Sequence, residues 1–188
     1  TSPPYINVFN YHQNYRKAME LMGWEPLKVA PSEIGANRKH RSNRFLTVIQ
    51  YCIDMAQVLH EIRRLLKPEG KVIIILGRES KVRGVSFMNG SLIAMLAIGG
   101  SGFQLSKWQE RRFVNRFGTP IYEDILTLAP DYSMSLLEPK FYGRKIGLWA
   151  LKEALNDAPN EEVKADIVHA IEHGAEVEPS PIQAWHSF

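Results

Sequence analysis

The sequence is poor in cysteine and contains no long hydrophobic run. Its one cysteine, Cys52, excludes a disulfide bond within these 188 residues. Because this thiol lies in an apolar stretch, we expect a buried structural residue in a reducing, cytoplasmic environment. The longest apolar candidate, residues 92–98, is too short to cross a bilayer, and no secretory signal pattern is present. We therefore expect neither a membrane protein nor a disulfide-rich secreted domain.

A strong excess of charge of one sign is also absent. Lys and Arg total 23 and Asp and Glu total 20, so the formal net charge is only +3. This mild basicity permits nucleic-acid binding without requiring it. The six histidines show no metal-ligand spacing, and we expect no metal. A hydrophobic fraction of 45% and a length of 188 residues predict one globular domain with a substantial core.

The apolar pattern predicts alternating helices and strands. Residues 47–66 repeat apolar side chains at helical spacing and predict a long helix that ends at Pro68 and Gly70. Residues 72–76 are all apolar, which predicts a central strand of a parallel sheet, buried on both faces. The other predicted elements are helices at 16–22, 87–98, 146–158 and 163–174, strands at 103–113 and 121–128, and a polar loop at 78–83.

These elements together predict an α/β fold. We expect part of a doubly wound, mostly parallel sheet with an antiparallel hairpin at its edge. The pattern changes after the second strand of that hairpin, where two amphipathic helices follow. The predicted division is a unit at residues 1–130 and a helical C-terminal extension at 131–188.

The residues most informative about chemistry are the first five, Thr1-Ser2-Pro3-Pro4-Tyr5. Two consecutive prolines have no N–H and a fixed φ, so they exclude a helix interior or a central strand and hold the chain extended. A carbonyl, a hydroxyl and an aromatic ring on such a rigid segment suit a planar group that carries an exocyclic amine. A proline-rich tail in polyproline II conformation is the alternative interpretation.

The tetrapeptide at residues 2–5 resembles the catalytic motif of the DNA amino-methyltransferases, which use S-adenosylmethionine (SAM). Its serine form is most similar to the cytosine-N4 class, since adenine-N6 enzymes usually carry Asp or Asn in place of Ser2. The turn at 67–70 with the following strand, and the two strands after residue 102, are similar to the fifth strand and edge hairpin of class I methyltransferases. The resemblance implies a Rossmann-like sheet, DNA as a partner, and a role in a prokaryotic restriction-modification system.

The resemblance also implies which residues hold the base. Ser2, Pro3, Pro4 and Tyr5 form the expected amine site for a cytosine flipped out of the duplex. Ser2 and the carbonyl of Pro3 would accept hydrogen bonds from the N4 amine, and Tyr5 would stack on the base. The candidate DNA-contacting residues are Asn10, Tyr11, Arg38, Lys39, Arg41, Arg44 and Arg78. The basic run within 38–44 also fits a solvated loop, but its place shortly after a base-binding motif favours phosphate contact.

The cofactor site is the part of the family pattern that this sequence lacks. In the family a glycine-rich turn and an acidic ribose ligand precede the motif, and here Thr1 is the first residue. We expect the SAM-binding half elsewhere in the same protein or on a second chain, with Thr1 as the one residue here that touches the cofactor. The glycines at 99–102 predict a helix-terminating turn instead, because they follow a predicted helix and precede a predicted strand. The isolated chain is therefore expected to be incomplete, inactive and unable to bind SAM.

Other functions stay open on the sequence alone. One is an amino-methyltransferase that acts on adenine N6, on RNA or on a protein glutamine, although the glutamine enzymes usually carry Asn in place of Ser2. Another is a non-catalytic half-domain that binds nucleic acid or a partner subunit. The missing cofactor half favours this second alternative.

Overall fold

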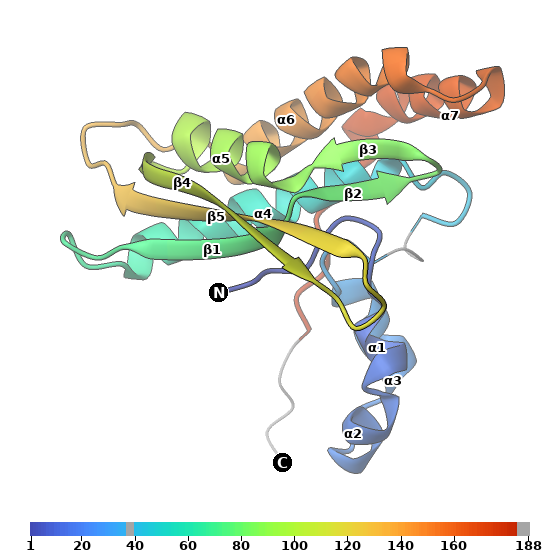
Figure 1. Ribbon diagram of the computed structural model, residues 1–188, viewed down its shortest axis with the longest axis horizontal. Coiled ribbons are helices and arrows are strands. Elements are labelled where there is room, and N and C mark those ends of the chain that lie inside the picture. The colour runs from blue at the N-terminus through green and yellow to red at the C-terminus, as the bar shows by residue number, and fades with distance from the viewer. Residues whose placement is uncertain (37–39, 184–188) are drawn as a thin grey trace.

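The computed structural model describes residues 1–36 and 40–183, and these form an α/β protein (Figure 1). The larger sheet has the strand order β1-β5-β4, with β1 at Val72–Gly77, β5 at Pro120–Pro130 and β4 at Phe103–Val114. Both pairings are antiparallel. A second sheet pairs β2 (Glu79–Val82) with β3 (Val85–Met88), also antiparallel. The predicted strands at 72–76, 103–113 and 121–128 are therefore confirmed in position, but β1 is the end strand of an antiparallel sheet and not the predicted central strand of a parallel one.

Strand β1 is not buried on both faces, and that prediction is wrong. Val72, Ile74 and Leu76 are buried, whereas the side chain of Ile73 is 51% exposed. An all-apolar run hides this alternation, because isoleucine at an exposed position looks the same in the sequence as isoleucine in the core. One face of β1 therefore joins the core, and the other is only partly covered.

The predicted polar loop at 78–83 is also wrong, because it contains strand β2. Ser80 and Val82 are buried and pair with Phe87 and Val85 across the hairpin. Arg83 and Gly84 form the connecting turn with φ of 49° and 88°, as in the two-residue turns whose twist suits a β-hairpin. Burial alternates along both strands, but the sequence of β2 hides this alternation because one of its buried residues, Ser80, is polar.

Seven α-helices surround the sheets in the described part of the chain. They are α1 (Tyr11–Asn14), α2 (Arg16–Leu21), α3 (Pro26–Val29), α4 (Leu46–Leu65), α5 (Asn89–Gly100), α6 (Pro139–Ala154) and α7 (Glu161–Glu172). Short 3-10 turns lie at Ala30–Ser32, Leu155–Asp157 and Gly174–Glu176. The predicted helices are present with shifted bounds, and α6 begins earlier than expected because Glu138 caps its first turn. None of these described helices is long and apolar enough to cross a membrane.

The core lies between the larger sheet and helices α4, α5 and α6. Helix α5 contacts all three strands of that sheet, and α4 and α6 pack against α5 and each other. Cys52 on α4 is fully buried, and burial raises the pKa of its thiol, as expected of a structural cysteine. Gly143 and Gly147 let the backbones of α6 and α4 come close, since a Cβ on Gly143 would lie 2.6 Å from the carbonyl oxygen of Cys52.

Residues after 130 belong to the same hydrophobic core as the rest. Ile146 and Leu151 on α6 and Ile167 on α7 are buried in one cluster with residues of α4, α5 and the larger sheet. The division at residue 130 stays a prediction about organisation. Helices α1–α3 form an arm that points away from the sheets, towards the side where the β4–β5 hairpin ends (Figure 1).

Candidate functional site

The first residue of the chain pairs with β1 in the parallel sense. The amino group of Thr1 donates to the carbonyl of Ile73 at 2.9 Å, and the N–H of Ile75 donates to the carbonyl of Thr1 at 3.0 Å. In a parallel bridge, one residue forms hydrogen bonds with both neighbours of the residue opposite it, and here Thr1 does so around Ile74. The chain therefore runs from Thr1 in the same direction as β1, towards the carboxyl end of that strand.

The proline segment brings Tyr5 to the end of β1. A Cβ placed on Gly77, the last residue of the strand, would lie 3.1 Å from Cε2 of Tyr5, so the ring lies close above the glycine. The hydroxyls of Ser2 and Tyr5 are 3.2 Å apart and form a hydrogen bond. Ser2 is exposed, whereas Pro3, Pro4 and Tyr5 are half-buried. The motif thus presents one accessible hydroxyl beside a partly covered aromatic ring.

The backbone that follows Tyr5 is held by polar contacts with one loop residue and with strand β2. The N–H of Asn7 donates to the carbonyl of Gly35 at 2.7 Å, and its side-chain amide donates to the carbonyl of Lys81 at 3.4 Å. Between them and the motif, Ile6 is fully buried. Asn7 itself has a φ of 57°, a left-handed conformation that asparagine tolerates better than most residues. These contacts anchor the motif at its C-terminal side.

A buried polar network closes the site below Gly77, and the sequence analysis missed it. The side-chain amide of Asn89, which is fully buried at the start of α5, donates to the carbonyl of Gly77 at 2.9 Å. It also contacts the hydroxyl of Ser80 at 3.0 Å. Asn89 therefore satisfies the carbonyl at the end of β1 and fixes the backbone beneath the Tyr5 ring. A signal was present, since Asn-Gly followed an alternating segment and preceded a helical one.

Arg78, a predicted DNA contact, is directed towards the hairpin. Its guanidinium is ion-paired with Glu110, lies 3.9 Å from Asp124, and is 4.8 Å from the centre of the Tyr122 ring. The hydrogen bond that Arg78 donates to Glu110 is the main cause that raises the pKa of Arg78. Its charge is already matched by carboxylates. The arrangement suits a structural link between β1 and the hairpin better than a phosphate contact.

Asn10 and Tyr11 lie at the start of α1 and are half-buried. The Tyr11 ring stacks between Phe9, at a centroid distance of 5.4 Å, and Tyr15, at 6.3 Å. Partial burial raises the pKa of Tyr11. These aromatic residues stack on one another along the arm, and no described contact connects Asn10 or Tyr11 to Ser2.

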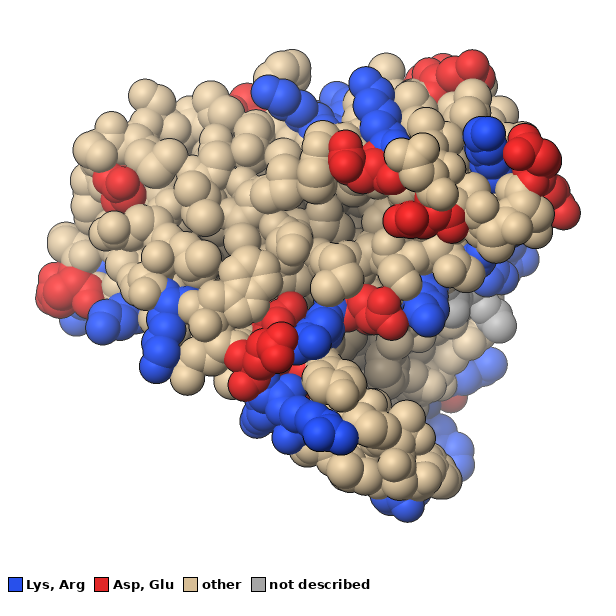
Figure 2. All heavy atoms as spheres, turned by 45° about the horizontal axis from the view of Figure 1, so that its top comes forward, with Lys and Arg blue, Asp and Glu red and all other residues tan. Residues whose placement is uncertain are grey.

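Two of the predicted phosphate-contacting residues can be placed. Arg38 and Lys39 lie outside the described residues. Arg41 and Arg44 are exposed, and neither forms an ion pair within residues 1–36 and 40–183. Figure 2 shows Lys and Arg in separate groups among carboxylates, so this face of the molecule has no continuous basic surface.

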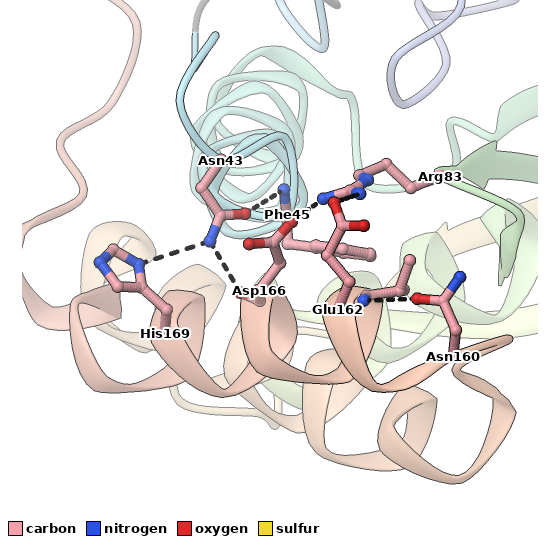
Figure 3. Close-up of polar contacts among 8 residues, drawn as sticks. Asn43, Phe45, Arg83, Asn160, Glu162, Asp166 and His169 are labelled. Atoms are coloured by element: carbon pink, nitrogen blue, oxygen red, sulfur yellow. Dashed lines mark hydrogen bonds and ion pairs between the residues drawn. The ribbon is translucent and has the colours of Figure 1, made fainter.

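The loop that carries these arginines is fixed to α7 (Figure 3). Asn43 accepts a hydrogen bond from the N–H of Phe45 at 3.0 Å and donates to the carbonyl of Asp166 at 2.7 Å. Arg83, from the turn of the β2–β3 hairpin, pairs with Glu162 at 2.6 Å and with Asp166. Helix α7 therefore connects the basic loop to the hairpin, and the loop has a defined backbone where Arg44 leaves it.

The described residues contain no cluster of three or more His, Cys, Asp or Glu side chains that could hold a metal ion. Comparison with protein-family models, with curated proteins and with solved structures found no match to this chain. The interpretation of the site therefore depends on its own geometry and on the motif.

Proposed function

We propose that this chain carries the amine-binding part of a SAM-dependent DNA cytosine-N4 methyltransferase. The observation that carries the proposal is the parallel pairing of Thr1 with β1, followed by Tyr5 against Gly77. Ligands of open α/β sheets bind outside the carboxyl ends of parallel strands, and the motif leaves its strand at that end. The β4–β5 hairpin lies on the other side of β1, which supports a Rossmann-like sheet with an antiparallel edge.

The residues of this chain act on the amine of a flipped cytosine. The lone pair of the N4 amine is delocalised into the ring, so the nitrogen is a poor nucleophile until its geometry becomes tetrahedral. Hydrogen bonds accepted by Oγ of Ser2 and by the carbonyl of Pro3 favour that geometry. The ring of Tyr5 stacks on the base, a contact worth about 1–3 kcal/mol. The hydrogen bond between Ser2 and Tyr5 holds the two groups together.

The described residues do not fit SAM itself. SAM supplies the methyl group, and in a doubly wound fold such a cofactor needs a strand, a glycine-rich turn and a helix in that order. The glycines at 99–102 instead end helix α5 and precede β4, as predicted. The space beside these glycines is also occupied by protein, because a Cβ on Gly100 would lie 2.3 Å from Cδ1 of Tyr142. We propose that another part of the protein or a second chain binds SAM, with Thr1 beside it, and that the assembly works in a prokaryotic cytoplasm.

Product analysis tests the reaction. The protein encoded by the full reading frame is incubated with methyl-labelled SAM and duplex DNA, and the DNA is digested to nucleosides. We expect label in N4-methylcytosine, and its loss in Ser2→Ala and Tyr5→Ala. The matched controls are Ser86→Ala and Tyr132→Ala, two exposed residues of the same types that lie away from the motif. Label only in N6-methyladenine, or only in RNA, contradicts the cytosine assignment.

Calorimetric titration of the 188-residue chain with SAM tests the cofactor argument separately. We expect no measurable heat of binding, because Tyr142 occupies the space beside the glycines of α5. Stoichiometric binding at micromolar concentration would show that a cofactor site exists within this chain. The amine-site proposal would survive that result, since it depends on Ser2 and Tyr5 alone.

A further inference from the structure

A cavity lies between the α1–α3 arm and the start of α4, and no residue of the amine motif lines it. Its volume is about 370 Å³. The lining residues are His12, Gln13, Leu27, Ala30, Pro31, Ala36, His40, Arg41 and Gln50. The wall from α3 and the following turn is apolar, and the donors come from α1, α4 and the loop before α4. Such a division between an apolar wall and a few polar groups is typical of small-molecule sites.

A buried histidine–glutamate pair forms one side of this cavity. His12 is 6% exposed and Glu33 is 8% exposed. Nδ1 of His12 is 3.0 Å from both carboxylate oxygens of Glu33, and the backbone N–H of His12 donates to the same carboxylate. A carboxylate has no proton to donate, so Nδ1 carries the proton. This fixes the imidazole ring and leaves its other nitrogen, Nε2, without a hydrogen bond among the described residues.

Nδ1 donates to Glu33, so a second proton on the ring would be carried by Nε2. In that form Nε2 is a hydrogen-bond donor. A neutral tautomer would make Nε2 an acceptor, which an anionic ligand would disfavour. In the charged ring Nδ1 donates to Glu33 and Nε2 donates to an anion in the cavity, one contact on each nitrogen.

Arg41 is a further donor at the cavity, and His40 lines the cavity with its Nε2 directed to Gln50. Arg41 lines it, is exposed, and has no carboxylate partner among the described residues. Nε2 of His40 lies 3.2 Å from the side-chain carbonyl of Gln50, and the amide of Gln50 donates to the carbonyl of Glu178 at 2.9 Å. This chain of contacts sets the orientation of the His40 ring. The polar side of the cavity thus carries the guanidinium of Arg41 and the imidazole of His12, and the carboxylate of Glu33 behind that imidazole is bonded to His12.

We propose that this cavity binds the phosphate group of a nucleotide, held by Nε2 of His12 and the guanidinium of Arg41. The planar guanidinium matches phosphate oxygens in a two-pronged contact. The apolar wall of Leu27, Ala30 and Pro31 receives the sugar or base attached to that phosphate. The nucleotide is either a free mononucleotide or a unit of a polynucleotide, and the phosphate contact is the same in both. The proposal goes beyond methyl transfer and does not depend on it.

Calorimetric titration of the full chain tests the site with dCMP, with deoxycytidine and with a short single-stranded oligodeoxynucleotide. We expect dCMP to bind and deoxycytidine, which lacks the phosphate, to bind at least about tenfold more weakly, since a charge-assisted hydrogen bond contributes about 1.5–3 kcal/mol. Binding of the oligonucleotide that dCMP displaces identifies the source as a polynucleotide; binding of dCMP alone identifies a free nucleotide. Equal affinity for dCMP and deoxycytidine, or no binding of either nucleotide form, overturns the proposal.

Variants locate the phosphate. Arg41→Gln changes an exposed residue, so the fold is retained, and we expect a loss of dCMP affinity of about tenfold. His12→Gln should have a similar effect, with circular dichroism to verify folding because this residue is buried. Lys17→Gln and His173→Gln are the matched controls, since both residues are exposed and outside the cavity. Unchanged affinity in Arg41→Gln contradicts the site even if His12→Gln fails to fold.

Discussion

Gly35 offers the sharpest test of how the motif is held. Its φ is +68°, and a Cβ at this position would lie 2.7 Å from the carbonyl oxygen of Tyr5 and 3.1 Å from Cδ2 of Tyr51. Its own carbonyl accepts the hydrogen bond from Asn7. Gly35→Ala therefore pushes on the backbone of the motif without changing any motif residue.

A second glycine separates the cost of the left-handed backbone conformation from the cost of the steric overlap. Gly118, in the turn between β4 and β5, has a φ of +79°, and nothing lies within 4 Å of a Cβ placed on it. Alanine in a left-handed conformation costs about 1–2 kcal/mol, and the lower entropy of the unfolded chain returns about 0.4–1 kcal/mol. Both terms apply to both glycines. The steric overlap, about 1–3 kcal/mol, applies to Gly35 alone.

Urea unfolding followed by circular dichroism measures the difference. We expect Gly118→Ala to lower the free energy of unfolding by about 1 kcal/mol and Gly35→Ala by about 2–4 kcal/mol. For a protein of this size each kcal/mol corresponds to about 2–4 °C in the melting temperature. Equal losses in the two variants would refute the argument, because they would show that the Tyr5 backbone moves aside without cost.

Three further substitutions test other features. Gly143→Ala should lower the free energy of unfolding by about 1–3 kcal/mol, because the added Cβ would overlap with α4. If α6 were loosely packed, alanine would instead raise the free energy of unfolding by about 1 kcal/mol, so the sign of the change in a urea titration distinguishes the two cases. Tyr51→Phe should raise the free energy of unfolding by about 1 kcal/mol, because the buried hydroxyl has no hydrogen-bond partner in the described part of the chain. Burial also raises the pKa of Tyr51 above its ordinary 10.0. As the pH rises past 10.0, Tyr51 ionises in the unfolded state but not in the folded state, so the free energy of unfolding falls. The Tyr51→Phe variant should therefore lose less stability than the parent protein between about pH 8 and pH 11. Arg44→Gln should reduce the salt slope of DNA binding by about one unit if this residue touches a phosphate, with exposed Lys152→Gln as the control that leaves the slope unchanged.

The sequence predicted those elements whose signals are local and strong. Helix α4 has a long apolar period and a proline–glycine end, and the structure confirms it at Leu46–Leu65. The strand at 72–76 was correct in position, but its one-sided burial was not predictable, because Ile73 and Ile74 carry the same side chain on opposite faces. The β2–β3 hairpin was missed because its turn places a non-glycine residue, Arg83, at positive φ.

The candidate site shows the same limit. The rigid motif at Ser2–Tyr5 could be recognised because its chemistry lies in consecutive residues. Asn89, which supports it from below, and the pair of His12 with Glu33 join residues that are far apart in the chain. The Asn-Gly pair at 89–90 was a local signal, but no short-range pattern indicates which groups Asn89 and His12 contact; the turn after Tyr5 and the packing of α5 bring these partners together. Long-range polar contacts were therefore the part of the site that required the structure.

The irregularity in β4 has a consequence for how this chain can change in length. The pairing shifts between Leu105, opposite Leu128, and Lys107, opposite Thr127, so one extra residue stands at Ser106. Beyond it, Trp108 and Glu110 lie opposite Leu126 and Asp124 on the core-side face. Deleting Ser106 would restore regular pairing and leave every later residue of β4 opposite its present partner, so Glu110 would stay on the face of Arg78 and only the local bend and twist of the strand would be lost. A single-residue deletion at Ser106 should therefore be tolerated better than deletion of a paired residue further along β4, because Ser106 has no partner on β5.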